Sequence, residues 1–346
     1  MPNQRDIAQK LGISQAAVSL ALRGHPSISP QQRKRVEQTA KALGYQANPY
    51  VSSLMAQIKA GRQPADQGVL ALIVDIYTKD DWFQHPSYQC YHAGIVSRSK
   101  ELGFKTDYFF LKEPGVTAAS IDRILYARGI RGVIMAPPYL SNRRLGLSWP
   151  RYACVGTGYG WEQQQIDRVA HDHDQNAAIA CRNLCALGYR RTGLCITTFY
   201  AKGRGTRWTN GFLACQHKLH PDGGIPVFIH SGDKRAFKDF KKWLNQWQPD
   251  SLLTVYGQER KWLDDCGLKA PDDIGLACLI KTPDSDLAGI NDRYDQVGKA
   301  AVELVASKIS YNQFGIPPYP KITLIEGQWE NGTSLDRVGP ALTVDF

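Results

Sequence analysis

Apolar and polar positions alternate along residues 68–280 in two repeating series. In each series, short runs rich in Val, Ile, Leu and Phe are followed by longer segments with an apolar residue every three or four positions. The short runs predict buried strands, and the longer segments predict amphipathic helices. Strands that alternate with helices form parallel sheets covered by helices on both faces. The pattern therefore predicts two doubly wound α/β subdomains with a ligand cleft between them.

The apolar runs and the glycines between them set the expected boundaries. The first series predicts strands at 68–77, 105–111, 132–137 and 152–158, with helices at 88–102 and 118–128. The second series predicts helices at 175–187, 205–219, 234–246 and 258–266, with strands at 192–199, 226–231, 251–257 and 274–280. Gly103 and Gly188 stand directly after two of the helices, where glycine commonly ends a helix.

Three short helices are expected before this region, at 4–11, 15–23 and 30–43. Asn3 and Ser14 are suitable N-caps, and Ser29 followed by Pro30 is a typical helix start. Gly12 supplies the left-handed conformation that ends the first helix. The inward-facing residues would form a minimal core: Ile7, Ala8, Leu11, Ala17, Val18, Ala21, Leu22, Val36, Ala40 and Leu43.

Two helices joined by a short turn that carries a glycine are typical of the helix-turn-helix motif. In that geometry the first residues of the second helix enter the major groove of DNA. Gln15 can pair with the edge of adenine, and Ala16 or Leu20 can contact a thymine methyl group. Contacts with DNA phosphates fix the position of the protein along the duplex. The side chains suited to such contacts are Ser14, Ser19 and Arg23. An ordinary helical hairpin within a bundle is the alternative.

Charge separates this N-terminal unit from the rest of the chain. Residues 1–62 contain nine Lys and Arg residues against two acidic ones, which gives +7 of the chain's net +10. A small, strongly basic unit on a nearly neutral body indicates a polyanionic partner, of which nucleic acid is the first candidate. A solvated surface that happens to be basic is the alternative.

Length and composition limit the remaining possibilities. A chain of 346 residues, 43% of them hydrophobic, is long enough for two or three well-filled domains. No apolar stretch approaches the roughly 18–20 residues that span a bilayer. The first residues, MPNQRDIAQK, lack the apolar core of a secretory signal. We therefore expect a cytoplasmic protein with no membrane partner.

The eight cysteines are scattered through apolar segments, which favours buried free thiols over a disulfide framework. Cys181 and Cys185 stand four apart on a predicted helix, downstream of His171 and His173, so a metal site is an alternative. No second ligand pair accompanies them, and their apolar surroundings favour a place in the core. We expect neither a metal nor a cofactor.

The segment after the third helix, GYQANPYVSSLMAQIKAG, offers a further short helix that starts at Asn48 and Pro49. Such a helix is too short to be stable alone. With this segment included, residues 3–58 resemble the DNA-binding headpiece and hinge of the lactose/galactose-repressor (LacI-type) transcription factors. The matching stretches are DIAQKLGIS, AAVSLAL, SISPQQRKRVEQTAKALGY, NP and Leu54.

The resemblance implies that the hinge helix orders on operator DNA, pairs with its dimer mate and pushes a leucine into the minor groove. Leu54 stands at the position of that leucine, and Asn48 begins the hinge helix. An apolar wedge of this kind unstacks and kinks the central base step. Packing of Leu54 within a linker is the alternative. Many relatives have Arg or His where this chain has Leu20, so its operator half-site should differ from the familiar ones. The expected DNA contacts are Ser14, Gln15, Ala16, Ser19, Leu20, Arg23, Asn48 and Leu54.

Residues 68–338 resemble the periplasmic-binding-protein-like core of the same family. The similar stretches are GIRGVIMAP, NLCALGYRRTGLC, GLKAPDDIGLACL and QVGKAAVELVASKI. The resemblance implies that the chain crosses between the two subdomains three times. We expect a headpiece at 1–45, a hinge helix and linker at 46–67, and an effector-binding and dimerisation core at 68–346. Within that core, the N-subdomain is expected at 68–166 and 290–320, and the C-subdomain at 167–289 and 321–338.

The effector site departs from the family pattern. Relatives commonly have Gly-Phe-Asp-Asp where this chain has Cys278-Leu279-Ile280-Lys281, so the sugar-binding aspartate is absent. Tyr88 falls where relatives place an aromatic that stacks on the ligand, and Asp172 matches a family aspartate. Trp208 replaces a family arginine, with Arg207 beside it. The expected effector contacts are Tyr88, Asp172, Arg207, Trp208 and Lys281. They indicate a ring-containing, anionic ligand such as an acidic or phosphorylated sugar, unless Trp208 is core and Lys281 is surface.

Catalytic chemistry finds little support in the sequence. The run His171-Asp172-His173-Asp174 contains groups that bind metals or transfer protons, but a strand end and a capped helix start explain it. No Gly-rich phosphate loop of the Lys-Ser/Thr type occurs, and no nucleophile-elbow pattern. The run GTGYG at 156–160 lacks the setting of a dinucleotide site. We expect no catalytic residues and no enzymatic activity.

The sequence thus predicts a homodimeric, sequence-specific DNA-binding regulator, a repressor by its resemblance. It would bind a pseudo-palindromic operator and respond to a small molecule, a sugar or sugar derivative, in the cleft. The alternatives are a solute receptor, an enzyme that acts on a sugar in the same cleft, and a regulator that uses a corepressor or no small ligand.

Replacing Leu54 with alanine should weaken operator binding and leave the dimer intact, because the variant loses the apolar wedge and no other predicted contact. Operator affinity and dimer mass, measured on the same preparation, check this. An unchanged affinity would show that Leu54 does not enter the DNA.

Overall fold

The computed structural model describes residues 4–22, 27–43, 68–76, 78–84, 86–138, 145–201 and 205–341. The predicted hinge helix and linker lie outside these ranges, as do Arg23, Asn48 and Leu54. None of the described helices is long and apolar enough to cross a membrane.

The N-terminal part forms the predicted three-helix headpiece. Its helices are α1 (Gln4–Leu11), α2 (Gln15–Leu22) and α3 (Pro30–Ala42). Ile7, Val18 and Val36 are completely buried at its centre. Gly12 has a φ of +67°, which a residue with a side chain rarely adopts, so the turn between α1 and α2 depends on this glycine. Two of the three predicted caps are confirmed: Ser14 accepts from the amide of Ala17, and Ser29 from that of Gln32. The third, Asn3, lies outside the described residues.

The N-subdomain is built on a six-stranded sheet in which every pairing is parallel, with the order β11-β5-β4-β3-β1-β2. Alternate residues of β1 enter different cores: Leu70, Leu72 and Val74 pack under one pair of helices, and Ala71 and Ile73 pack on the opposite face. The strands are β1 (Gly68–Val74), β2 (Phe104–Phe110), β3 (Gly132–Met135), β4 (Ala153–Thr157), β5 (Asp167–His171) and β11 (Ile322–Ile325). The pair on the first face is α6 (Pro86–Glu101) and α13 (Tyr294–Ser310), and α7 (Ala118–Ala127) lies on the second.

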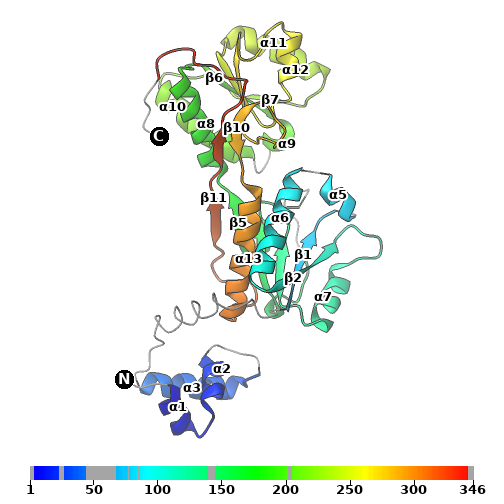
Figure 1. The fold of residues 1–346 in the computed structure, drawn as a ribbon, viewed down its shortest axis with the longest axis vertical. Coiled ribbons are helices and arrows are strands. Elements are labelled where there is room, and N and C mark those ends of the chain that lie inside the picture. The colour runs from blue at the N-terminus through cyan, green and yellow to red at the C-terminus, as the bar shows by residue number, and fades with distance from the viewer. Residues whose placement is uncertain are drawn as a thin grey trace.

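The C-subdomain repeats this architecture with the strand order β12-β10-β9-β8-β6-β7, in which only β12 runs antiparallel to its neighbour among the described pairings. Its strands are β6 (Thr192–Thr197), β7 (Phe228–His230), β8 (Ser251–Thr254), β9 (Gly275–Cys278), β10 (Ala288–Asn291) and β12 (Gln328–Glu330). Helices α8 (His173–Leu187) and α10 (Gly205–Leu219) pack on one face, and α11 (Lys234–Trp247) and α12 (Arg260–Asp265) on the other. Figure 1 shows the two subdomains with chain segments passing between them. The short helices α5 (Lys79–Phe83) and α9 (Thr198–Ala201) and the 3-10 turns Trp149–Arg151 and Glu162–Gln164 complete the core.

Each crossing between the subdomains comes later in the chain than predicted. Strand β5 pairs with β4 and β11, so residues 167–171 and 322–325 belong to the N-subdomain sheet. Strand β10 pairs with β9 and β12, so residues 288–291 belong to the C-subdomain. The predicted limits at 166, 290 and 320 are therefore wrong. Strands of four or five residues carry too short a pattern to be assigned to one of two sheets before their pairing is known.

Glycines let the covering helices approach closely at two places. A Cβ on Gly94 of α6 would collide with the carbonyl oxygen of Asp295 in α13, and one on Gly298 would lie 2.5 Å from the carbonyl oxygen of Tyr91. Gly211 of α10 meets the backbone of Asp174 in α8 in the same way. Figure 1 shows α6 and α13 side by side on the N-subdomain. These contacts fix the relative positions of the first turns of α8 and α13.

A buried ion pair ties three segments of the N-subdomain together. Nζ of Lys308 in α13 lies 2.5 Å from Oδ2 of Asp167 at the start of β5, and the two side chains are 4% and 9% exposed. The other carboxylate oxygen of Asp167 accepts from the amide of Lys321, just before β11. Removing either charge would leave the other buried without a partner.

Replacing Lys308 with methionine should lower the free energy of unfolding by about 3–5 kcal/mol, because Asp167 would remain as an uncompensated buried charge. The double variant with Asp167→Leu should recover part of this loss. Urea unfolding of the three proteins measures both effects.

Lys299→Met is the matched control, since Lys299 pairs with Asp295 on the same helix with side chains 35% and 42% exposed. Its loss should be about 0–1 kcal/mol. Equal losses for the two lysines would contradict a special role for the buried pair.

Candidate functional site

The predicted DNA-reading residues that the structure describes lie together on α2. Ser14, Gln15 and Ala16 are exposed at its N-terminal end, and Ser19 and Leu20 are half-buried along it. Gln15 is already held in place, because Nε of Arg5 donates to its side-chain oxygen at 3.3 Å. The hydrogen bond from Arg5 therefore orients the side-chain amide of Gln15. Arg5 is itself suited to contact a DNA phosphate. The end of α2 is therefore an exposed polar surface with a defined orientation.

Basic side chains accompany this surface on the other two helices. Exposed cations lie on α1 and on α3: Arg5, Lys10, Lys34, Arg35 and Lys41. The described acidic residues of the headpiece are Asp6 and Glu37. The excess of positive charge favours the phosphates of a nucleic acid independently of its sequence.

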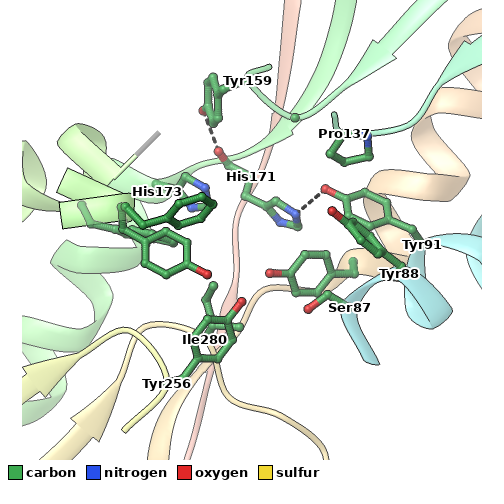
Figure 2. Close-up of a pocket in the computed structure, with 14 residues that line it drawn as sticks. Ser87, Tyr88, Tyr91, Pro137, Tyr159, His171, His173, Tyr256 and Ile280 are labelled. Carbon is green, nitrogen blue, oxygen red and sulfur yellow. Dashed lines mark hydrogen bonds between the residues drawn. The ribbon is translucent and has the colours of Figure 1, made fainter. Parts of the chain in front are cut away.

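A cavity of about 150 Å³ lies between the two subdomains. Figure 2 shows its side chains converging from both sides. The N-subdomain contributes Ser87, Tyr88, Tyr91, Pro137, Gly158, Tyr159, His171 and Tyr294. The C-subdomain contributes His173, Phe199, Tyr200, Trp208, Tyr256 and Ile280. A ligand here would touch both subdomains at once.

Two of the five predicted effector residues line this cavity. Tyr88 stands in the first turn of α6, and its ring is stacked on Trp82 at 4.5 Å between centroids. Trp208 stands in the first turn of α10 and is 1% exposed, with its ring 4.1 Å from that of His173. Trp208 therefore belongs both to the hydrophobic core of the C-subdomain and to the cavity wall.

The other three predicted residues are engaged outside the cavity lining. Asp172 caps α8 by accepting from the amide of Gln175 at 3.0 Å. Arg207 lies over the ring of Tyr159, 4.3 Å from its centroid, and forms an ion pair with Asp174 at 3.4 Å.

Lys281 donates from Nζ to the carbonyl oxygens of Leu287 and Asn331, at 2.5 and 3.3 Å. The two cations on which the expectation of an anionic ligand rested thus bind other groups of the protein.

Sequence reasoning missed the two histidines that flank Asp172. The strand end and the capped helix start are as predicted, with β5 ending at His171 and α8 beginning at His173. Yet both imidazoles turn inward, are 4% exposed, and line the cavity. The alternation of β5 was the available signal, because Val169 and His171 share one face of that strand. The five missed tyrosines, at positions 91, 159, 200, 256 and 294, come from five separate segments and give no local signal.

Hydrogen bonds hold His171 in one orientation and one tautomer. Its Nδ1 lies 2.9 Å from the carbonyl oxygen of Asp292, which can only accept, so Nδ1 carries the proton. Nε2 of the neutral ring then accepts from the hydroxyl of Tyr91 at 2.8 Å. The carbonyl of His171 accepts from the hydroxyl of Tyr159 at 2.6 Å. Both ring nitrogens are thereby used within the protein.

The side chain of Asn176 joins the three segments that cross between the subdomains. Asn176 lies in the first turn of α8, directly after the first crossing, and is completely buried. Its amide nitrogen donates to the carboxylate of Asp292 in the second crossing at 2.7 Å. Its oxygen accepts from the amide of Gly327 in the third crossing at 2.7 Å. The first and third crossings are also joined by the amide of Asp172 and the carbonyl of Ile325.

Burial raises the pKa of Asp292 to about 7, although hydrogen bonds from Tyr294 and Asn176 act in the opposite direction. Burial likewise raises the pKa of Tyr159 to about 12. Near neutral pH the carboxyl group of Asp292 is therefore only partly ionised, and the hydroxyl of Tyr159 is neutral.

The fold and these two sites define a class of protein: a transcriptional regulator with a helix-turn-helix headpiece and a periplasmic-binding-protein-like core. Residues 4–48 match the family model described as "Bacterial regulatory proteins, lacI family". The headpiece therefore matches this family, in agreement with the resemblance that its sequence predicted.

Curated relatives extend the similarity beyond the headpiece. An uncharacterized HTH-type transcriptional regulator, YkvZ of Bacillus subtilis (strain 168), is 25% identical over 330 residues, 89% of this chain and 94% of the relative. The HTH-type transcriptional regulator MalR of Staphylococcus xylosus is 31% identical over 102 residues, 30% of this chain and 28% of MalR. Both relatives are HTH-type transcriptional regulators.

Solved structures show the same fold over nearly the whole chain. The transcriptional regulator CelR in complex with cellobiose has a TM-score of 0.58 at 17% identity, and covers 96% of this chain and 100% of CelR. The Lac repressor dimer bound to operator and the anti-inducer ONPF has a TM-score of 0.56 at 18% identity. The match covers 96% of this chain and 99% of the Lac repressor chain. At this identity the likeness shows the fold alone, which is the predicted combination of a headpiece and two parallel-sheet subdomains.

Replacing Asp292 with asparagine should change how stability depends on pH. The folded state holds the Asp292 proton more tightly than the unfolded chain, whose ordinary pKa is 3.8. This tighter proton binding contributes at most about 4 kcal/mol to the free energy of unfolding. The contribution is fully present below pH 4 and is lost as the pH rises through about 7. The asparagine variant should show a smaller loss between pH 5 and 8, measured by urea unfolding.

Asp265→Asn, on the exposed end of α12, is the control and should keep the wild-type pH dependence. If the Asp292 variant and wild type lose stability in parallel over this range, burial of the carboxyl group is not the cause.

Proposed function

We propose that this regulator is a cytoplasmic repressor that binds a pseudo-palindromic operator as a homodimer and is modulated by a small molecule in the inter-subdomain cavity. The observation that carries the proposal is the exposed N-terminal end of α2, where Ser14, Gln15 and Ala16 lie on the surface that would face a DNA groove. The likeness to the Lac repressor dimer on its operator supports the dimeric, operator-bound arrangement.

The headpiece supplies both kinds of contact that a sequence-specific binder needs. Gln15 can form a paired hydrogen bond with adenine, and Ala16 can contact a thymine methyl group. The exposed lysines and arginines of α1 and α3 provide the phosphate contacts that make binding steeply dependent on salt. Two copies of such a headpiece bind two half-sites, which accounts for a pseudo-palindrome.

The cavity can act on DNA binding through the three crossings. A ligand that contacts both subdomains changes the free energy of their relative placement, because it binds one placement better than the other. The N-subdomains move with this placement, and in the proposed dimer they carry the hinge segments that lead to the headpieces. Coupling energies of this kind are typically about 1–3 kcal/mol. A sugar effector is the expectation drawn from the family, and the CelR structure holds cellobiose in the same fold.

Selection of bound sequences from a random double-stranded DNA pool, at near-physiological salt, tests the proposal. Recovery of a palindrome with a deformable central step would support a dimeric operator reader. Retention that is sensitive to salt but blind to sequence would count against it.

Gln15→Ala should weaken binding to the selected operator by about 1–3 kcal/mol and relax the preference at one position of each half-site, because Gln15 reads a base edge. Binding to unrelated DNA should change little. Competition binding of the variant against both DNAs measures this difference. Gln38→Ala, at an exposed position of α3, is the matched control and should leave operator affinity unchanged. Equal losses on both DNAs would indicate that Gln15 contacts only the backbone.

A further inference from the structure

The eight cysteines of the chain are all free thiols, and three of them gather where helices α8 and α10 pack together. Cys181 and Cys185 stand four positions apart on α8, so they share one face of that helix. Cys215 stands on α10 and belongs to the same buried cluster as Cys181. The function proposed above uses none of these thiols.

The two helices approach one another closely enough for their side chains to be cross-linked. A Cβ on Gly211 of α10 would lie 2.3 Å from the carbonyl oxygen of Asp174 in α8, so the backbones are in contact there. Cys215 follows Gly211 by four positions and Cys181 follows Asp174 by seven, which places both cysteines on the contacting faces.

Helices that pack about 8–10 Å apart bring facing Cα atoms to within about 3–6 Å of one another. This range overlaps the roughly 4.4–6.8 Å between the Cα atoms of a disulfide. A bond between Cys181 and Cys215 would therefore fit the helix pair as it is already packed.

A hydrogen bond joins these two thiols, because the thiol of Cys181 donates to the sulfur of Cys215. This bond lowers the pKa of Cys215, and the positive charges of Arg182 and Lys218 act in the same direction, against the effect of burial. The pKa of each of the other seven cysteines is raised. Since the thiolate is the reactive form of cysteine, Cys215 is the favoured nucleophile, with a protonated thiol beside it.

The pair is nearly, but not completely, covered. Cys181 and Cys215 are 4% and 3% exposed, whereas Cys195 is 0% exposed. A cavity of about 10 Å³ lies against Cys181 and Cys185 and is bordered by the exposed Arg190. Such a volume holds about one molecule of the size of water. The oxidant that suits this site is therefore a small one such as hydrogen peroxide, because a peptide disulfide is too large for the cavity.

We propose that Cys181 and Cys215 are a site of reversible oxidation, at which hydrogen peroxide converts the two thiols into a disulfide between α8 and α10. In the first step the Cys215 thiolate attacks one peroxide oxygen, the O–O bond breaks, and Cys215 becomes a sulfenic acid. The hydroxide that leaves takes up the proton that Cys215 had released and becomes water.

In the second step the sulfur of Cys181 attacks the sulfur of Cys215. The S–O bond breaks, and the hydroxyl group leaves as water with the proton of Cys181. Two electrons have then passed from the thiols to the peroxide, and two water molecules have formed. A thiol reductant reverses the reaction by thiol–disulfide exchange.

The cross-link would join two helices that reach the inter-subdomain cavity. The first turn of α8 carries His173, and the first turn of α10 carries Trp208. Oxidation would hold these helices, and the two rings, in one relative position. The chemistry involves neither DNA nor an effector, so its failure would leave the proposed function as it stands.

Peptide mapping after a short exposure of the full chain to hydrogen peroxide tests the proposal. The remaining thiols are alkylated in denaturant, and the protein is digested with trypsin in the absence of reductant. Trypsin separates the three cysteines onto the peptides 169–182, 183–190 and 208–218. The expected product is a cross-link between the first and the third of these peptides. Its mass should be two hydrogen atoms below the sum of the two, and dithiothreitol should abolish it.

Cys90 and Cys266 are the controls within the same chain, because they are more exposed and no other thiol influences their pKa. They should form no cross-link while the disulfide appears. Cys215→Ala should abolish the disulfide and slow the oxidation of Cys181 about tenfold or more, because the remaining thiol has lost the neighbouring thiolate. Cys266→Ala is the matched control variant and should form the disulfide as wild type does. The wild-type peptide map decides the matter if the Cys215 variant does not fold.

Three results would overturn the proposal. The first is the absence of the cross-linked peptide at a dose of peroxide that has already oxidised Cys90 or Cys266. The second is a cross-link that forms through Cys185 in place of Cys181. The third is oxidation of the completely buried Cys195 as fast as that of Cys181, which would indicate general unfolding and no specific site.

Discussion

The side chain of Asn176 holds together the three segments that pass between the two subdomains. The wall of the inter-subdomain cavity depends on this junction. Its amide group donates to Asp292 and accepts from Gly327, while its own helix starts directly after the first crossing. The same segments carry His171, His173 and Tyr294 into the cavity wall. A change in the relative placement of the subdomains must therefore pass through a buried, fully directional set of hydrogen bonds. Such a junction favours a small number of discrete arrangements over continuous bending.

Helix packing sets the positions of the rings around this junction. Gly94 and Gly298 bring α6 and α13 into backbone contact, and Gly211 does the same for α10 and α8. The first turns of these four helices carry Tyr88, Tyr294, Trp208 and His173. A bulkier residue at any of the three glycines would separate a helix pair and move the rings at its end. The chemistry of the cavity is thus a consequence of how closely the covering helices approach one another.

The two sites of the protein differ in how they are built. The DNA-facing surface is local, because one short helix and its cap place Ser14, Gln15 and Ala16 together. The cavity is assembled from both subdomains and from residues more than two hundred positions apart. A helix-turn-helix can diverge in base preference by single substitutions at exposed positions.

The sequence by itself determined the headpiece with its match to the lacI family, and the alternation of strands and helices. Caps, glycine stops and apolar spacing are local signals, and Gly12, Ser14 and Ser29 perform the predicted roles. Tyr88 and Trp208, which the resemblance suggested as ligand contacts, both line the cavity. Only the tertiary structure decided the pairing of the short strands β5, β10 and β11, the inward turn of His171 and His173, and the engagement of Arg207 and Lys281 with other groups. The physical reason is that strand pairing, burial and hydrogen-bond partners depend on residues distant in the chain, which local periodicity does not encode.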